Sequence, residues 1–195
     1  MIKFTAIATR TARLAHRQTI PRISSNKRLA STMGSTYNTA APNIPGAPIP
    51  IFVVGQREEI AQFVIEAVKP EYEVVQMILG KAAKEELPIY LRGEIPATKS
   101  SQLGSNNWAV PPRAILIGGA FNDAEVAELR QTVVDAGATR KIPWLHVDHN
   151  KPRPVIVGNE AQYGDSIAQR FKDALNRLRD EGRLDADGDD SDVLV

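Results

Sequence analysis

The sequence predicts an α/β domain of three layers, in which helices cover both faces of a doubly wound, Rossmann-like or flavodoxin-like parallel sheet. Two observations carry this prediction. Short segments that are apolar along their whole length alternate with segments whose apolar residues repeat every three or four positions, a combination typical of buried parallel strands joined by amphipathic helices. The length of 195 residues, with 43% hydrophobic and 24% charged residues, suits one such domain with tails at its ends.

Four segments are expected to form the strands of this sheet. They are 49–55 (IPIFVVG), 72–79 (YEVVQMIL), 113–118 (RAILIG) and 142–148 (IPWLHVD), with 155–158 (VIVG) as a candidate fifth. Aliphatic and β-branched residues dominate each run, as they do in strands buried on both faces. Because parallel strands are joined by right-handed crossovers, few arrangements remain, and we expect the order 2-1-3-4.

The segments between these strands carry the periodicity of helices. Helices are expected over about 60–69, 81–87, 122–136 and from about 165 to 179. Pro70 and Pro88 are expected to end the first two, because proline lacks the N–H that would continue the helix. Asn122 and Glu125 have the spacing of a capping box at the start of the third helix.

The first 30 residues have the composition of a mitochondrial transit peptide. They contain seven Lys or Arg residues and no Asp or Glu, and they are rich in Ser, Thr and Ala. The segment RLAS (28–31) has the arginine spacing of a matrix-processing site. We therefore expect import into the mitochondrial matrix. The alternatives are a disordered basic tail, or a cytosolic form translated from Met33.

Two further segments are expected to lie outside the folded core. Residues 31–48 hold three prolines and few large apolar side chains, which is typical of a linker with polyproline II character. Residues 180–195 carry seven acidic residues, and their glycine does not have the position that a calcium loop requires. We expect a solvated, disordered acidic tail there. The Rossmann-like domain is thus expected over 49–179.

A ligand crevice is expected at the carboxyl ends of the first and third strands, because the winding direction of the sheet reverses between them. The residues expected to line it are Gly55, Gln56, Arg57, Gly118, Gly119, Asn122 and Asp123. Both glycine turns lead into helices, whose first N–H groups can receive a phosphate or carboxylate. Neither turn has the spacing of a dinucleotide fingerprint or a P-loop, so plain turn chemistry is the competing interpretation.

The segment 88–112 is long for a connection inside a compact domain, and such segments are usually lids, binding loops or disordered. It contains Arg92, Glu94, Asn107 and Trp108. We interpret it either as a lid over the crevice or as a contact with another subunit or protein, with a plain insertion as the alternative.

The stretch WLHVDHN (144–150) contains two of the three histidines. Side chains alternate along a strand, so His146 and Asp148 are expected on one face and His149 on the other. His146 and Asp148 are candidates for acid–base chemistry. The alternative is that His146 is a hydrogen-bonded core or rim residue and Asp148 caps the following turn. No metal site is complete in the sequence, because a facial triad needs a further ligand from elsewhere.

Four stretches resemble a known group of proteins. LRGE, GSNNW, PPRAILIGGAF and IPWL, within residues 50–180, are similar to small, uncharacterised Rossmann-like proteins of filamentous fungi. The resemblance implies the fold. It supplies no catalytic residue to transfer to this chain.

Composition excludes several classes of function. The chain has no cysteine, which excludes disulfides, thiolate metal sites and cysteine nucleophiles. No run reaches the ~18 apolar residues of a membrane span, so membrane insertion is not expected. Without the first 30 residues the chain keeps 17 basic and 23 acidic residues, which argues against nucleic acid as a partner.

Three functions remain. The leading hypothesis is a mitochondrial protein that binds a nucleotide, NAD(P) included, or another small anionic ligand in the crevice, with or without weak catalysis. The alternative is a non-enzymatic interaction or assembly protein, with a homodimer or partner contact through 88–112. The second alternative is a metal-dependent lyase or isomerase that uses His146, Asp148 and His149.

Overall fold

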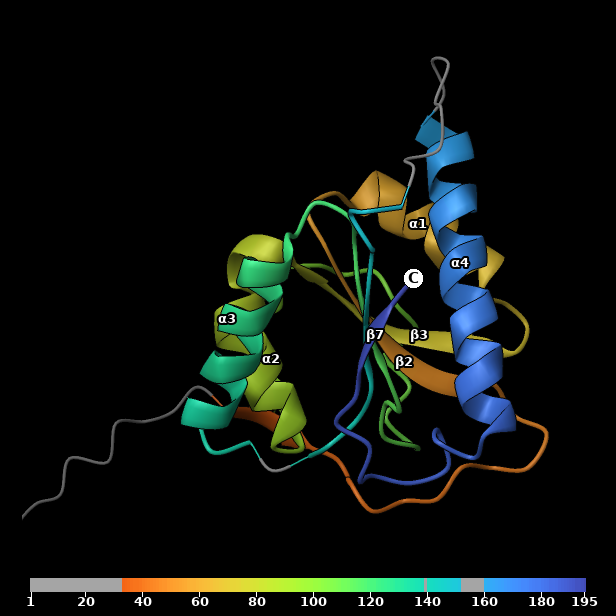
Figure 1. The fold of residues 1–195 in the computed structure, drawn as a ribbon. Helices are drawn as coiled ribbons and strands as arrows, with labels where there is room; N and C mark the ends of the chain where they lie inside the picture. The colour runs from red at the N-terminus through yellow and green to blue at the C-terminus, as the bar shows by residue number, and fades with distance from the viewer. Residues whose placement is uncertain (1–32, 139, 152–159) are drawn as a thin grey trace, which may run out of the picture. The chain divides into compact units, whose positions relative to one another are not determined.

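Five parallel strands form the central sheet of the protein (Figure 1). In the order of the sheet they are β3 (Tyr72–Leu79), β2 (Ile49–Gly55), β5 (Ile115–Ile117), β6 (Trp144–His146) and β7 (Asp192–Leu194). The computed structural model describes residues 33–138, 140–151 and 160–195. The expected transit peptide (1–30) and the candidate strand 155–158 lie outside the described residues.

The four expected strands lie in the expected order, and a further strand comes from the C-terminal segment. β3, β2, β5 and β6 correspond to the order 2-1-3-4. The sheet continues with β7, which comes from the acidic C-terminal segment and pairs in parallel with β6, Leu145 opposite Val193. The winding direction changes between β2 and β5, as in doubly wound folds.

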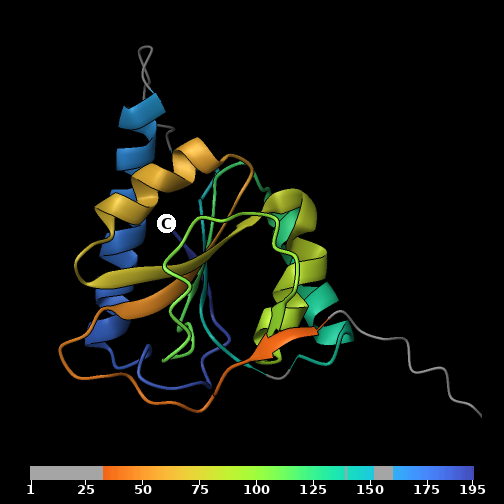
Figure 2. The same ribbon diagram turned by 180° about the vertical axis from the view of Figure 1, so that it is seen from behind.

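Two pairs of helices cover the two faces of the sheet (Figures 1 and 2). On one face lie α1 (Glu58–Ala67) and α4 (Glu160–Asp180), and on the other lie α2 (Ala83–Leu91) and α3 (Asp123–Asp135). A short 3₁₀ helix, Gly80–Ala82, precedes α2. The fold is therefore a three-layer α/β domain.

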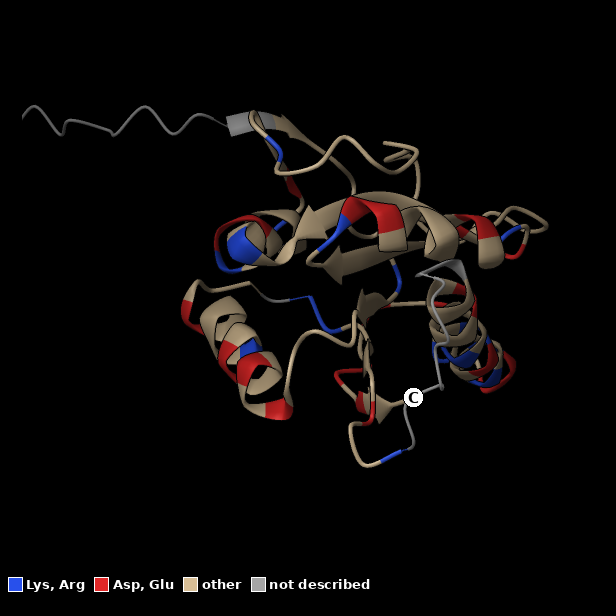
Figure 3. Cartoon of the chain, turned by 90° about the horizontal axis from the view of Figure 1, so that it is seen from above, with Lys and Arg blue, Asp and Glu red and all other residues tan. Residues whose placement is uncertain are grey.

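Alternation along the strands gives each face its own apolar core. Val53, Leu116 and Leu145 pack with α1 and α4, whereas Phe52 and Ile117 pack with α2 and α3. Charged residues lie mainly on the helices and loops, and the central strands are almost free of them (Figure 3). No helix among the described residues combines the length and apolar character that crossing a membrane requires.

The expected end of the second helix at Pro88 is wrong. α2 continues through Pro88 to Leu91, and the Pro88 carbonyl accepts a hydrogen bond from Arg92 N at 3.2 Å. Proline costs a helix about 3 kcal/mol in isolation. Here the fully buried side chains of Leu87, Tyr90 and Leu91 pack on the sheet, and their burial offsets that cost.

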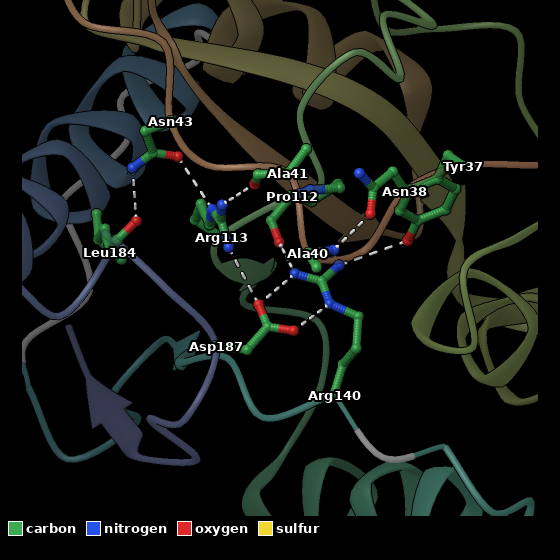
Figure 4. Close-up of polar contacts among 10 residues, drawn as sticks. All are labelled: Tyr37, Asn38, Ala40, Ala41, Asn43, Pro112, Arg113, Arg140, Leu184 and Asp187. Atoms are coloured by element: carbon green, nitrogen blue, oxygen red, sulfur yellow. Dashed lines mark hydrogen bonds and ion pairs between the residues drawn. The ribbon is translucent and has the colours of Figure 1, made fainter.

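The linker and the acidic tail are joined through Arg113, at the amino end of the sheet (Figure 4). Arg113 Nε donates to Asn43 Oδ1 at 3.0 Å, and its Nη1 donates to the Asp187 carboxylate at 3.2 Å. Its Nη2 donates to the Ala41 carbonyl. The Asn43 amide in turn donates to the Leu184 carbonyl at 2.8 Å. The linker, the residues just before β5 and the tail therefore share one polar network.

These contacts correct two expectations. Within the expected linker 31–48, β1 (Met33–Thr36) pairs antiparallel with β4 (Glu94–Pro96). The tail 180–195 is not disordered, because it supplies β7 and buries Leu184, Val193 and Val195 in the core. Two of its acidic side chains, Asp187 and Asp190, pair with arginines on distant parts of the chain, so their charge does not keep the segment in solvent.

Candidate functional site

A cavity of 570 Å³ lies at the carboxyl ends of β2 and β5, between α1 and α4. Its walls are Ile60, Ala61 and Val64 on α1, and Tyr163, Ile167 and Phe171 on α4. Its floor is formed by Val53, Val54 and Leu116, and its rim by Gly55, Gln56, Arg57, Gly118, Gly119 and Ala120. This is the edge of the sheet where the strand order reverses, the usual ligand position in doubly wound folds.

The structure brings together five of the seven residues expected to line the crevice. Gly55 is the last residue of β2, Gln56 and Arg57 follow it, and Gly118 and Gly119 follow β5. The two turns meet because β2 and β5 are adjacent parallel strands, with Val54 opposite Ile117. Both glycine turns therefore lie at one rim.

Asn122 and Asp123 do not line the cavity. The Asn122 side chain accepts a hydrogen bond from Glu125 N at 3.0 Å, and the Glu125 carboxylate accepts one from Asn122 N at 2.8 Å. This capping box occupies the polar groups at the start of α3. Asp123, the first residue of α3, lies 3.7 Å from Nδ1 of His146. The expectation that these two residues line the crevice is therefore wrong.

The start of α1 differs from that of α3, because no side chain caps it. Arg57 is the N-cap residue and makes no side-chain cap hydrogen bond. The first N–H groups of a helix have no partner inside the helix, and they carry a partial positive charge. Two carboxylates lie in this first turn, and both are engaged. Glu58 accepts a hydrogen bond from the Ser101 hydroxyl, and Glu59 lies 3.7 Å from the guanidinium of Arg57.

Tyr163 is the one hydroxyl-bearing side chain that lines the cavity, and it was not among the residues expected there. A Cβ atom on Gly119 would lie 2.8 Å from the Tyr163 hydroxyl oxygen, so this tyrosine occupies space that only glycine leaves open. That hydroxyl makes no hydrogen bond to the described parts of the chain. Tyr163, Ile167 and Phe171 repeat at intervals of four, which is the signal that could have identified this wall.

The three histidine and aspartate residues expected to be catalytic do not converge. His146 is buried and faces α3 and β7, with Nε2 2.8 Å from an Asp192 oxygen. Asp148 accepts a hydrogen bond from Asn150 N at 2.9 Å, as a turn cap does. His149 Nε2 is 2.6 Å from the Phe121 carbonyl oxygen. Acid–base pairing of His146 with Asp148 is therefore not supported.

Metal binding by these residues is not supported either. The described residues contain no group of three or more His, Asp or Glu side chains placed to hold a metal ion. Asp148 and His149 border a recess beside the cavity, together with Lys151 and Arg170. The recess measures 10 Å³, which is at most the space of one water molecule.

The four residues expected to form a lid also lie away from the cavity. Arg92 and Glu94 pair with each other at 3.4 Å. The Asn107 amide donates to the Glu73 carboxylate at 3.2 Å. The Trp108 ring packs between aromatic side chains, with centroids 5.0 Å from Tyr37 and 5.4 Å from Tyr90.

The segment 88–112 instead covers the edge of β3. Met77 N donates to the Leu103 carbonyl, and Ser105 N donates to the Val74 carbonyl, both at 2.9 Å. An uncovered edge strand exposes unpaired N–H and C=O groups that invite aggregation. The long segment satisfies these groups, which corrects the expectation of a lid.

A second hollow, of 680 Å³, lies between α1, β3 and residues 103–105. It is larger than the first, but it lies away from the switch point. Its rim charges are already paired, Lys69 with Glu66 at 2.8 Å and Glu73 with Asn107. We therefore take the cavity between α1 and α4 as the candidate site.

A curated relative shows the family. The chain is 36% identical over 145 residues to Kojic acid related protein 6 of Aspergillus oryzae, and the match covers 73% of this chain and 86% of the relative. The chain belongs to the family of Kojic acid related protein 6. The expected resemblance to fungal proteins is thereby confirmed at the level of this family. No family model and no solved structure matches the chain.

Proposed function

We propose that this member of the Kojic acid related protein 6 family binds a nucleotide or another small anionic ligand in the cavity between α1 and α4. One observation carries the proposal. A cavity of 570 Å³ lies at the switch point, where two glycine turns and an uncapped helix start meet. This volume falls within the range of small-molecule sites, about 300 to 1,000 Å³.

The groups at the rim have complementary roles in this proposal. The N–H groups at the start of α1 and the guanidinium of Arg57 receive the anionic group. Gly118 contributes only backbone to the rim, since it carries no side chain, whereas the Tyr163 hydroxyl fills the space beside Gly119. The Tyr163 hydroxyl supplies a donor or acceptor at the opposite wall.

We propose ligand binding in this cavity and assign no acid–base role to its residues. His146 lies on the face of the sheet covered by α3, whereas the cavity lies on the face covered by α1 and α4. A dinucleotide is one member of the ligand class. The turn at the end of β2 holds one glycine, Gly55, where a dinucleotide fingerprint has three. The sequence therefore does not favour NAD(P) over other members of the class.

A thermal-shift panel tests the proposal. The panel contains nucleotides, pyridine dinucleotides, small organic acids, divalent metals and kojic acid, which the name of the relative brings into consideration. A ligand at about 100 times its Kd adds about 2.7 kcal/mol of stability, a shift of a few degrees for a domain of this size.

Two variants locate the binding. Arg57→Ala and Gly118→Ala should reduce the shift. A Cβ at Gly118 lies 3.4 Å from the Val54 carbonyl oxygen, so this change is expected to be compatible with folding. Arg179→Ala is the matched control, because Arg179 is also an arginine, partly exposed, that is paired with a neighbouring carboxylate, Asp180. An equal effect of Arg179→Ala would place the binding elsewhere.

Failure of every ligand would favour the interaction or assembly protein. That result, together with a defined protein that co-purifies with the chain, would replace the binding proposal. The surface of segment 88–112 would then be the first place to test, because Arg92 and Asn107 lie within it.

We also propose that the protein is imported into the mitochondrial matrix. The support is the basic, acid-free composition of residues 1–30. N-terminal sequencing of the protein from its native cells should begin near Ser31. An intact Met1, or a start at Met33 with a cytosolic distribution, would overturn this proposal.

A further inference from the structure

We infer that the ligand of the cavity between α1 and α4 is an amphipathic monoanion: an organic acid whose apolar body lies between the two helices and whose acid group lies at Arg57. This inference rests on the proposed function and narrows it. A nucleotide and a fatty or aromatic acid both carry an anionic group, but they differ in what the rest of the cavity must provide.

The walls of the cavity provide almost no polar groups. Three of the fifteen lining residues have polar side chains, namely Gln56, Arg57 and Tyr163. Nine others are aliphatic or aromatic, and three are glycines. A base and a ribose need several hydrogen-bonding partners, because a polar group buried without them is costly. An alkyl or aryl body needs none.

The polar groups also gather at one end. Gln56 and Arg57 lie at the rim and are exposed, whereas Ala61 and Val64 of α1 are buried in the wall beneath them. On the opposite wall Ile167 and Phe171 are 3% and 2% exposed. The cavity is therefore polar at its mouth and apolar at depth, which matches a molecule with one polar end.

The charged side chains at the mouth of the cavity favour a ligand with a single negative charge. One cationic side chain, Arg57, lines the cavity, and Glu58 and Glu59 follow it in the first turn of α1. A di- or triphosphate brought here would meet these two carboxylates, and like charges repel. A carboxylate carries one charge, and it would replace Glu59 as the partner of the Arg57 guanidinium while the helix N–H groups receive its second oxygen.

A homologous series of straight-chain carboxylic acids tests the inference on the full chain. Calorimetry should show that each added methylene tightens binding about fourfold, the value expected for burying one such group. The trend should stop when the cavity is filled. The methyl ester of a binding acid should bind at least tenfold more weakly, because it lacks the charge.

A matched pair of variants tests where the apolar body of the ligand binds. Ile60 and Ile65 are both half-buried on α1, but Ile60 lines this cavity and Ile65 lines the hollow beside β3. Ile60→Ser should weaken the binding of the longer acids and flatten the dependence on chain length. Ile65→Ser should change neither.

The possible outcomes distinguish a failure of this inference from a failure of the proposed function. If nucleotides bind with sensitivity to Arg57→Ala and the acids do not, the binding proposal stands and the amphipathic ligand is rejected. Acids that bind without a dependence on chain length, or equally well in Ile60→Ser, also reject it. If neither class binds, the proposed function itself fails.

Discussion

Arg140 donates two hydrogen bonds to the carboxylate of Asp187, one from Nε and one from Nη2, and both are 2.7 Å long. Arg113 shares the same carboxylate at 3.2 Å. Both guanidinium groups are almost fully buried, with side chains 3% and 4% exposed. Burial lowers the pKa of Arg113, and the Asp187 charge opposes this effect. One carboxylate therefore balances two buried cations.

Replacing Asp187 by Ala should destabilise the protein strongly. Breaking a buried ion pair at one partner costs about 3 to 5 kcal/mol, because the other charge stays buried without compensation. Here two cations are affected. Urea unfolding measures the loss. Asp190→Ala is the control, since Asp190 is half exposed where it pairs with Arg130, and such pairs contribute under about 1 kcal/mol. Similar losses in the two variants would contradict the role of Asp187.

Glu86 should make the stability depend on pH. Its Oε1 accepts a hydrogen bond from Ser100 N at 2.6 Å, whereas its buried Oε2 makes no hydrogen bond within the described structure. Burial raises the pKa of Glu86, and the hydrogen bonds from Ser100 oppose this only in part. The folded state therefore holds the proton more tightly than the unfolded state. Stability attributable to this group falls as the pH rises from the ordinary glutamate range through the raised pKa.

The variant Glu86→Gln removes this titration. It should be more stable than the wild type at about pH 7, and the difference should shrink at about pH 4, where the wild-type carboxyl is largely protonated in both states. Urea unfolding at a series of pH values measures the difference. Glu85→Gln is the control, because Glu85 is exposed on the same helix. A gain for Glu86→Gln that did not change with pH would disprove the explanation.

The strands could be predicted because their burial is visible locally. Segments 49–55 and 72–79 are apolar on both faces and form β2 and β3 with the same bounds. The tail could not be predicted in this way. Its acidic residues indicate solvent exposure, while the cations that pair with Asp187 lie 74 and 47 residues away. The apolar run Val193–Val195 at its end was the overlooked signal.

The candidate site was predictable where it depends on topology alone. Adjacent parallel strands had to bring Gly55 and Gly118 to one edge. Tyr163 was not predicted, because the expected helix began near Asp165. The helical pattern is interrupted at Gly164, since glycine is a poor helix former. The sequence also did not show which face of the sheet would border the cavity. Alternation along the strand predicted that His146 and Asp148 share one face, but it could not predict whether that face is the one with the cavity.

We expect that segment 88–112 needs Gly104 in order to cover the edge of β3. Its φ is +118°, and a Cβ there would lie 2.5 Å from the Val75 carbonyl oxygen. Gly104→Ala combines backbone strain with a steric clash and should cost more stability than Gly188→Ala. Gly188 also has positive φ, +140°, but no neighbouring atom lies within 4 Å of the added Cβ.

Hydrogen exchange identifies the place of the damage in Gly104→Ala. The amide of Met77, which donates to the Leu103 carbonyl, should exchange faster than in the wild type, because local opening of this contact exposes it. In Gly188→Ala the exchange of Met77 should be unchanged. Equal protection of Met77 in both variants would show that the segment 88–112 does not depend on Gly104.

Gly164 should set the separation of the two helices that wall the cavity. It lies in α4, and a Cβ there would lie 2.7 Å from Cβ of Phe63 on α1. In a helix, alanine is favoured over glycine by about 1 kcal/mol. The clash should outweigh this gain, because neither Cβ can rotate away, and overpacking costs about 1 to 3 kcal/mol. We therefore expect Gly164→Ala to lower the free energy of unfolding and to weaken ligand binding by moving α1 from α4. Gly55→Ala is the control for stability, because its Cβ would meet only Met77, at 3.6 Å. A stabilised Gly164→Ala protein would show that α1 and α4 can separate freely, and the cavity would then have no fixed width with which to select a ligand.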